Sequence, residues 1–139
     1  MRGHTLQIIK KDDGKELYYL TQFITENKNG DIWTSDWEKR AVVVVNKSGR
    51  HRFDYTGCQS NFSPRGICTV GLGHVLVCDY VNCSVHLLDQ DGQFLSLVLT
   101  REEHGLHRPT ALSVVNKNNI YLGQEFSNTI NVYKCANLK

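Results

Sequence analysis

The stretch GHVLVCDYVNCSVHLLDQDG, residues 73–92, decides how this chain is read. The stretch GDIWTSDWEKRAVVVVNKSG, residues 30–49, has the same pattern forty-three residues earlier. In each stretch an apolar run ends at an aspartate (Asp36 or Asp79), a polar loop and a second apolar run follow, and a glycine closes the unit. Apolar runs joined by short polar turns predict antiparallel β-strands.

A third, shorter copy starts about forty-five residues further along, at Asn119-Ile120. Gln124 stands at the place of the aspartate, and the only two prolines, Pro64 and Pro109, share one phase of the repeat. A repeat of about forty residues made of strands is typical of β-propeller blades. We therefore expect an all-β chain, a partial β-propeller of about three four-stranded antiparallel blades.

The pattern places one blade at residues 21–57, a second at 64–100 and an incomplete third at 109–135 of a single unit, 1–139. The expected strands of the first blade are 22–25, 31–36, 41–46 and 50–56. Those of the second are 65–70, 74–79, 84–89 and 93–99. The third would hold 110–115, 119–124 and 129–134. Residues 5–20 resemble the last hairpin of a preceding blade, with strands at 6–10 and 16–20.

Three blades cannot close a ring, because closed propellers have about four to eight blades. The faces of the terminal blades would then expose apolar surface. We expect the chain to be part of a larger propeller. Self-association through the exposed blade edges is the alternative.

The composition excludes several classes of protein. The net charge of +2 is too small to indicate nucleic-acid binding by itself, and no apolar stretch is long enough to cross a membrane. The five cysteines form no C-x-x-C pair, so we expect no structural zinc site. Cys68 and Cys78 occupy apolar strand positions and are interpreted as buried thiols, which suits a reducing, cytoplasmic location.

The repeats resemble the NHL repeat. The resemblance rests on Leu72-Gly73-His74-Val75-Leu76-Val77-Cys78-Asp79, on Val85-His86-Leu87-Leu88-Asp89-Gln90-Asp91-Gly92, and on the first copy from Asn29 to Gly49. It covers residues 24–134 and looks most like the propellers of tripartite-motif proteins. The family's Asn-His-Arg triplet is kept only at its first position, Asn82.

This resemblance implies a propeller that recruits protein substrates or RNA for a ubiquitin ligase. In that family a zinc-binding RING carries the catalysis, and this sequence has no comparable cysteine-histidine array. We therefore expect a non-catalytic recognition module without cofactor or metal, which binds a protein partner, with RNA as the alternative ligand. A propeller-type metal-dependent enzyme is a third, weaker hypothesis.

The candidate binding residues lie in loops that a propeller gathers on one face. An aromatic residue recurs near the same slot of each repeat, among basic groups that suit a protein hot spot or RNA stacking. The candidates are Trp37, Lys39, Arg40, Arg65, Tyr80, Asn82, Arg108 and Phe126. An equal alternative is that Trp37 and Tyr80 pack as wedges between blades.

Other polar residues favour structural roles. Asp36 and Asp79 recur at one phase, which favours carboxylates that accept backbone N–H bonds over catalytic or metal-binding ones. His104 and His107 could face one ion, but no carboxylate or cysteine lies near them in sequence. His74 and His86 are interpreted as packing or rim residues.

Overall fold

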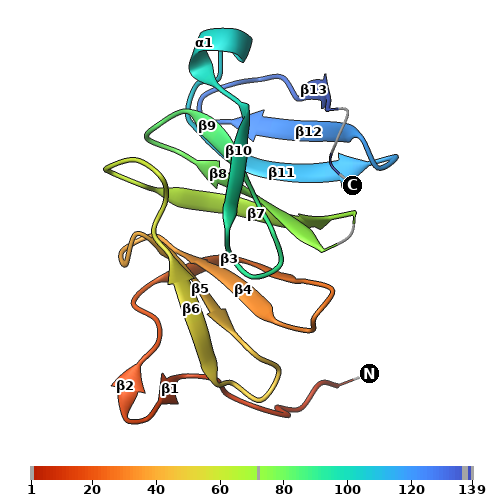
Figure 1. The fold of residues 1–139 in the computed structure, drawn as a ribbon. Coiled ribbons are helices and arrows are strands. Elements are labelled where there is room, and N and C mark those ends of the chain that lie inside the picture. Colours follow the sequence, from red (N-terminus) through yellow and green to blue (C-terminus); the bar gives the residue numbers. More distant parts are fainter. Residues whose placement is uncertain (1, 72, 136–137, 139) are drawn as a thin grey trace.

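Three successive antiparallel sheets make up most of the computed structural model, which describes residues 2–71, 73–135 and 138. Blade 1 consists of β3 (Thr21–Glu26), β4 (Ile32–Asp36), β5 (Ala41–Val45) and β6 (His51–Tyr55). Blade 2 consists of β7 (Pro64–Val70), β8 (His74–Asp79), β9 (Ser84–Leu88) and β10 (Phe94–Leu99). Blade 3 has β11 (Pro109–Val115), β12 (Asn119–Gln124) and β13 (Asn131–Lys134). Figure 1 shows the sheets stacked one after another.

The expected all-β fold of four-stranded antiparallel blades is confirmed. Every strand expected in the three repeats is formed, and the ends agree to within two residues. The sequence pattern is informative because the middle strands are covered on both faces: every residue of β5 and β9 is buried. Continuous apolar runs are what such strands require.

Two hydrophobic cores lie between the blades. Alternate residues of one strand point to opposite faces of its sheet, so blade 2 contributes to both cores. Val75 and Val77 pack toward blade 1, against Trp33. Val85 and Leu87 pack in the core shared with Ile120, Leu122 and other residues of blade 3.

The blades approach most closely at their inner strands. Strand β7 contacts β3 and β4 on one side and β11 on the other. A Cβ atom at Gly66 would lie 2.8 Å from both the Cα of Ala111 and the carbonyl oxygen of Thr110. The absence of a side chain at Gly66 therefore permits the packing distance between β7 and β11.

The leading segment differs from the expected hairpin of residues 6–10 and 16–20. Only β1 (Lys11–Asp12) and β2 (Lys15–Glu16) form, as a separate two-stranded sheet. No strand forms at the expected residues 6–10: Ile9 packs beside Val43 and Val45 of β5, but Leu6 is 91% exposed. The backbone N–H groups of Tyr19 and Leu20 donate to the Asp36 carboxylate instead of continuing a strand ladder.

One helical turn, α1 (Arg101–His104), was not expected from the sequence. The Thr100 side chain accepts a hydrogen bond from the backbone N–H of Glu103 at 3.1 Å, and Gly105 ends the helix in the left-handed conformation at φ 67°. The spacing of Thr100 and Glu103 matches a capping box. This spacing of Thr100 and Glu103 is the sequence feature from which the helical turn could have been predicted.

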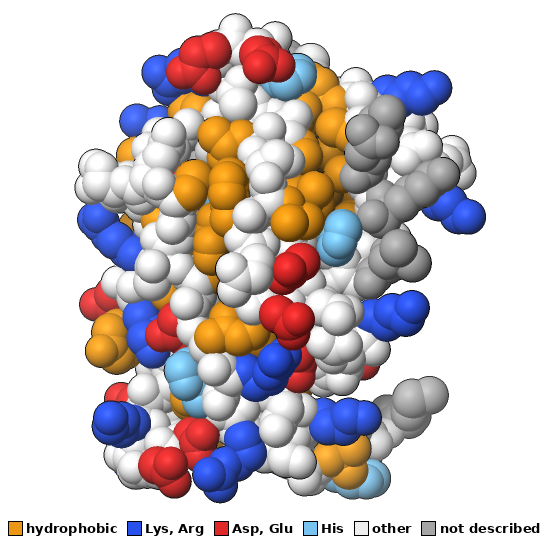
Figure 2. All heavy atoms as spheres, viewed as in Figure 1, with side chains coloured by type: hydrophobic (Ala, Val, Ile, Leu, Met, Phe, Trp, Pro, Cys, Tyr) orange, Lys and Arg blue, Asp and Glu red, His pale blue; other side chains and the backbone are white. Residues whose placement is uncertain are grey.

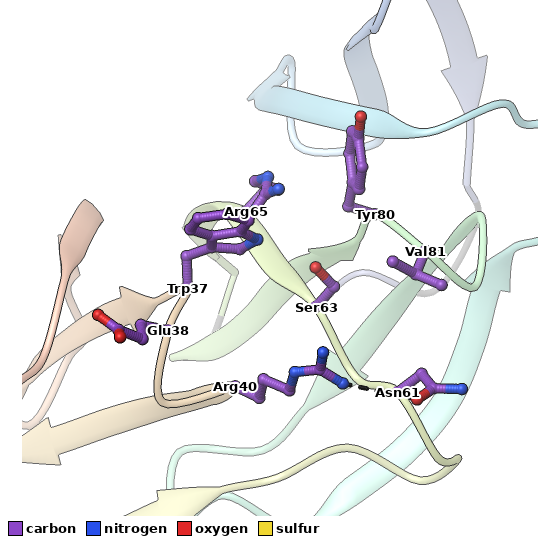
Figure 3. A pocket seen from close by; sticks show the side chains of 8 residues that line it. All are labelled: Trp37, Glu38, Arg40, Asn61, Ser63, Arg65, Tyr80 and Val81. Carbon is purple, nitrogen blue, oxygen red and sulfur yellow. Dashed lines mark hydrogen bonds between the residues drawn. The ribbon is translucent and has the colours of Figure 1, made fainter.

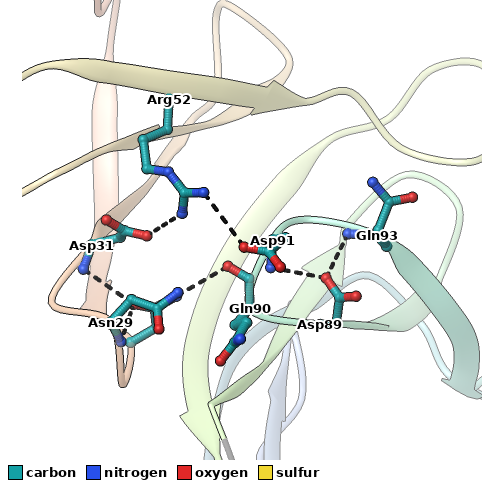
Figure 4. Close-up of polar contacts among 8 residues, drawn as sticks. Asn29, Asp31, Arg52, Asp89, Gln90, Asp91 and Gln93 are labelled. Atoms are coloured by element: carbon teal, nitrogen blue, oxygen red, sulfur yellow. Dashed lines mark hydrogen bonds and ion pairs between the residues drawn. The ribbon is translucent and has the colours of Figure 1, made fainter.

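Polar side chains connect blades 1 and 2 at one rim, where the β3–β4 and β9–β10 turns meet (Figure 4). The Arg52 guanidinium contacts the Asp31 carboxylate of blade 1 and lies 3.4 Å from the Asp91 carboxylate of blade 2. The Asn27 side-chain amide donates to the Gln90 carbonyl oxygen at 3.3 Å. These contacts engage polar groups of this rim, Arg52, Asp31, Asp91 and Asn27 among them, in holding blades 1 and 2 together.

Apolar side chains remain exposed at both ends of the stack. Ile24 of blade 1 is 67% exposed, and Val132 of blade 3 is 54% exposed. A further apolar strip follows the outer strand of blade 2, where Phe94 and Leu95 are exposed. Figure 2 shows hydrophobic side chains gathered on the upper half of this face. No helix within residues 2–71, 73–135 and 138 is long and apolar enough to cross a membrane.

Candidate binding face

A pocket of about 530 Å³ lies at the junction of blades 1 and 2, on the rim opposite the Arg52 contacts. Its walls come from the β4–β5 turn, the connection from β6 to β7, the start of β7 and the β8–β9 turn. Figure 3 shows the side chains around it. The lining residues are Trp37, Glu38, Arg40, Asn61, Ser63, Arg65, Tyr80 and Val81.

Arg65 is held between the two aromatic walls of this pocket. Its guanidinium carbon lies 4.9 Å from the centre of the Trp37 ring and 4.4 Å from the centre of the Tyr80 ring. A second guanidinium, from Arg108, lies 5.4 Å from the same Tyr80 ring, and its Nη1 lies 3.4 Å from the Tyr80 hydroxyl. Side chains from all three blades or their connections thus form one continuous row, Trp37–Arg65–Tyr80–Arg108.

Trp37 is not a buried wedge between blades, and Tyr80 is half-buried. Trp37 is 45% exposed, whereas Trp33 is the tryptophan that packs in the core between blades 1 and 2. Each ring nevertheless has a guanidinium against it, which restricts what else can stack there. Contacts of this kind contribute about 0.5–2 kcal/mol, depending on solvent exposure.

Partial burial lowers the pKa of the Arg65 guanidinium, and the nearby Glu125 carboxylate opposes that change. The group stays protonated, because an arginine does not lose its proton in a protein. Its Nη1 atom is buried and has no hydrogen-bond partner among the described residues. Arg65 therefore brings a positive charge to the pocket without a matching carboxylate in contact with it.

The other candidate residues divide into two groups. Arg40 lines the pocket, and its Nη1 lies 3.5 Å from the Asn61 side-chain oxygen. Lys39 turns away from the pocket: its Nζ donates to the Leu17 carbonyl oxygen at 2.9 Å and lies 3.4 Å from the Asp54 carboxylate.

Asn82 and Phe126 also lie outside the pocket. The Asn82 amide donates to the Asp79 carboxylate at 2.9 Å and to the Ser60 carbonyl oxygen at 3.1 Å. Phe126, in the turn between β12 and β13, is 92% exposed. Asn82 therefore orders the loop after β8, while Phe126 is an isolated ring on blade 3.

The pocket includes Asn61 and Ser63, which sequence reasoning did not select. Both lie in the connection from β6 to β7, where the repeats offer no matching pattern. Asn61 has a positive φ of 62°, a conformation in which asparagine is enriched. Ser63 could have been selected only from its place directly before Pro64, the proline that recurs in the next repeat as Pro109.

Asp36 and Asp79, which recur at one phase of the repeat, accept hydrogen bonds from backbone N–H groups, as that recurrence predicts. Asp36 accepts hydrogen bonds at 3.0 Å from the backbone N–H groups of Leu20 and Lys39. Asp79 accepts one at 3.0 Å from the backbone N–H of Ser63. In blade 3 the Gln124 side-chain oxygen accepts one at 2.7 Å from the backbone N–H of His107. Each blade thus uses the last residue of its second strand to fix the connection that enters the blade.

Asp79 also belongs to a buried polar chain between blades 1 and 2. Its carboxylate lies 3.2 Å from His86 Nε2, and His86 Nδ1 lies 2.8 Å from the Tyr55 hydroxyl. Burial raises the pKa of Asp79, but the nearby His86 ring and hydrogen bonds from Asn82 and Ser63 outweigh it and leave the pKa below its usual value. Because His86 and Asp79 are fully buried, this chain of residues fixes the packing of the blades.

The described residues contain no group of three or more His, Cys, Asp or Glu side chains that could hold a metal ion. His104 is used locally, since its Nδ1 accepts a hydrogen bond from the backbone N–H of Thr100. All five cysteines are free. Cys78 is buried, and Cys68 is half-buried with a pKa raised to about 12 by burial.

Solved structures place the chain in the class of β-propeller-like proteins. Virginiamycin B lyase from Staphylococcus aureus is 15% identical with a TM-score of 0.68, over 82% of this chain and 40% of the lyase chain. Kuenenia stuttgartiensis hydrazine synthase is 15% identical with a TM-score of 0.70, over 98% of this chain and 37% of that chain. At these identities the likeness establishes the fold alone.

A streptogramin B lyase structure gives a similar result, with 17% identity and a TM-score of 0.60, over 83% of this chain and 40% of that chain. The present chain thus spans less than half the length of these propeller-like chains. No protein-family model and no curated protein matches the sequence. The chain is therefore a partial β-propeller.

Proposed function

We propose that this chain is a non-catalytic recognition module that binds a protein partner through the Trp37–Tyr80 pocket. The observation that carries the proposal is the row Trp37–Arg65–Tyr80–Arg108 along the rim of a concave surface. Tryptophan, tyrosine and arginine are the residues most enriched in protein hot spots. Here their stacking on one another pre-orders the side chains, which lowers the entropy lost on binding.

The chemistry of the pocket suits binding better than proton transfer. Its cationic groups, Arg40 and Arg65, are guanidinium groups, which do not exchange protons near neutral pH. The buried His86–Asp79 pair, which could otherwise move a proton, has no exposed surface.

RNA binding is a second candidate function. The cluster of Arg40, Arg65 and Arg108, with the exposed ring of Phe126 on blade 3, favours it. Two features count against it. Arg65 occupies one side of both the Trp37 and Tyr80 rings, so these sides are closed to bases, and Glu38 adds a negative charge beside the pocket.

We further propose that the module serves as the substrate-recognition part of a tripartite-motif-type ubiquitin ligase in the cytoplasm. The likeness of the two clear repeats to NHL repeats supports this proposal, and five free cysteines suit a reducing compartment. The test is the reading frame that encodes the chain: a RING and a B-box in the same frame would support the proposal. A frame that encodes a secretory signal and no RING would contradict it.

Selection from a displayed library of random linear peptides tests the recognition function directly. Peptides enriched on the wild-type chain should bind W37A or Y80A with a loss of about 2 kcal/mol, because either ring would be a hot spot. Arg50→Ala changes a charge at the opposite rim and serves as the control. Equal binding to wild type, W37A and Y80A would place the recognition surface elsewhere. Binding of single-stranded RNA that weakens steeply with salt would favour the second candidate.

A further inference from the structure

We infer that the Trp37–Tyr80 pocket receives a carboxylate, the side chain of a single glutamate or aspartate in an extended, otherwise uncharged segment of the partner protein. The inference rests on the proposed recognition function and goes further by naming the chemical group that enters. It follows from three features of the pocket: its uncompensated charge, its unused hydrogen-bonding groups and the occupied faces of its rings.

The charges of this surface do not balance. Among the described residues, the carboxylates near Arg40, Arg65 and Arg108 are those of Glu38, which lines the pocket, and Glu125. Arg108 lies 3.7 Å from Glu125, but within the described residues neither Arg40 nor Arg65 forms an ion pair. A single negative charge placed near Arg40 and Arg65 would compensate the excess.

Two guanidinium groups also lie against one ring. Arg65 and Arg108 are 4.4 Å and 5.4 Å from the centre of the Tyr80 ring, so their like charges repel each other across a partly buried surface. The ring offsets this repulsion only in part, through its weak attraction for cations. An anion in the pocket would reduce it further.

Hydrogen-bonding groups suited to a carboxylate surround the same space. Figure 3 shows the Ser63 hydroxyl on the pocket wall between Arg40 and Tyr80. Among the described residues, the Arg40 guanidinium makes one side-chain hydrogen bond, a long one of 3.5 Å from Nη1 to the Asn61 side-chain oxygen. Most of its N–H groups therefore have no protein acceptor among these residues. A planar guanidinium matches the two oxygens of a carboxylate.

A carboxylate fits this surface better than a nucleic-acid backbone does. The excess of one positive charge matches one carboxylate, whereas a chain of phosphates would bring further negative charges close to Glu38. Arg65 covers one face of the Trp37 ring and one face of the Tyr80 ring, which leaves less ring surface for nucleotide bases.

A titration followed by nuclear magnetic resonance tests the inference on the full chain. The probe is an acetylated, amidated peptide of glycine and serine with one central glutamate, and its partner peptide has glutamine at that position. The glutamate peptide should shift the indole N–H signal of Trp37, while the signal of the buried Trp33 stays in place. The glutamine peptide should bind at least about tenfold more weakly, because it lacks the charge that strengthens hydrogen bonds to guanidinium groups.

Three variants sharpen the result. Arg65→Gln should weaken binding of the glutamate peptide by about tenfold. Glu38→Gln should tighten it by about twofold, because a repelling carboxylate is removed. Arg50→Gln removes one positive charge, as Arg65→Gln does, but at the opposite rim. It should leave the affinity for the glutamate peptide unchanged. The opposite signs expected for Arg65 and Glu38 distinguish anion binding from a general loss of structure.

Equal affinity for the glutamate and glutamine peptides would overturn the inference, as would weaker binding of the glutamate peptide to E38Q. If neither peptide binds while a neutral peptide from the library binds through Trp37, the carboxylate inference is wrong and the recognition function stands. If neither these peptides nor the library peptides bind and an RNA strand shifts the Trp37 signal, both proposals are wrong.

Discussion

The guanidinium carbon of Arg65 lies 4.4 Å from the centre of the Tyr80 ring, although Arg65 is the second residue of the inner strand of blade 2 and Tyr80 follows the second strand of that blade. The same guanidinium reaches Trp37 of blade 1, so this one side chain links the loops of two blades. The contact stabilises the blade junction and shapes the candidate pocket at once.

Replacing Arg65 by alanine should therefore affect stability as well as binding. We expect the free energy of unfolding to fall by about 1 kcal/mol, because two cation–π contacts are lost at a partly exposed site. Urea unfolding followed by circular dichroism measures the change. Arg50→Ala, which removes an exposed arginine from the opposite rim, should change the free energy by less than about 0.5 kcal/mol. Equal losses in the two variants would show that the stacking does not contribute to stability.

Replacing Gly66 by alanine should destabilise the packing between blades 2 and 3. The added Cβ would lie 2.8 Å from backbone atoms of β11, which cannot move aside as a flexible side chain could. We expect a loss of about 1–3 kcal/mol in the free energy of unfolding. Gly123→Ala is the matched control, because its Cβ would meet its nearest neighbours at 3.9 Å. A G66A protein as stable as G123A would contradict the close approach of β7 and β11.

The Asp79 carboxylate should make the free energy of unfolding depend on pH in the acidic range. Its pKa in the folded protein is lowered, so its contribution is fully present above the unfolded value of about 3.9 and is lost as the pH falls through the lower folded value. Urea unfolding of wild type and Asp79→Asn at a series of pH values measures this contribution. The difference between the two proteins should be largest at neutral pH and shrink toward pH 2. A difference that is constant with pH would contradict the charged role of Asp79.

The exposed apolar ends of the stack should cause the isolated chain to self-associate. Ile24 at one end and Val132 at the other are more than half exposed, and β13 has no strand partner on its outer edge among the described residues. Sedimentation at increasing concentration should show a growing mass. Val132→Lys should reduce this association, because a charge on an edge strand discourages pairing. A monomer that persists at high concentration would contradict the prediction.

Sequence reasoning could predict the blades because their decisive contacts repeat. The apolar runs of residues 30–49 and 73–92 mark strands buried on both faces, and the phase of Asp36 and Asp79 marks the ends of the second strands. The repeat also predicts that Trp37 and Tyr80 lie near each other, because equivalent loops of neighbouring blades lie at the same rim.

The remaining features depend on contacts that do not repeat. Lys39 turns to the Leu17 carbonyl oxygen, and that depends on where the non-repeating leading segment lies. Asn61 and Ser63 enter the pocket through a connection without a counterpart in the other repeats. The stacking of Arg65 on two rings depends on side-chain conformation, which strand patterns do not encode.

The two aromatic walls of the pocket belong to different repeats, so a single excised blade would contain only one of them. A pocket built at a junction of blades can change through the few side chains at its margin while the strands beneath it stay the same. Under the proposed recognition function, ligand preference would depend on both neighbouring blades, so a shift of one sheet against the next would alter it without a change in sequence at the pocket.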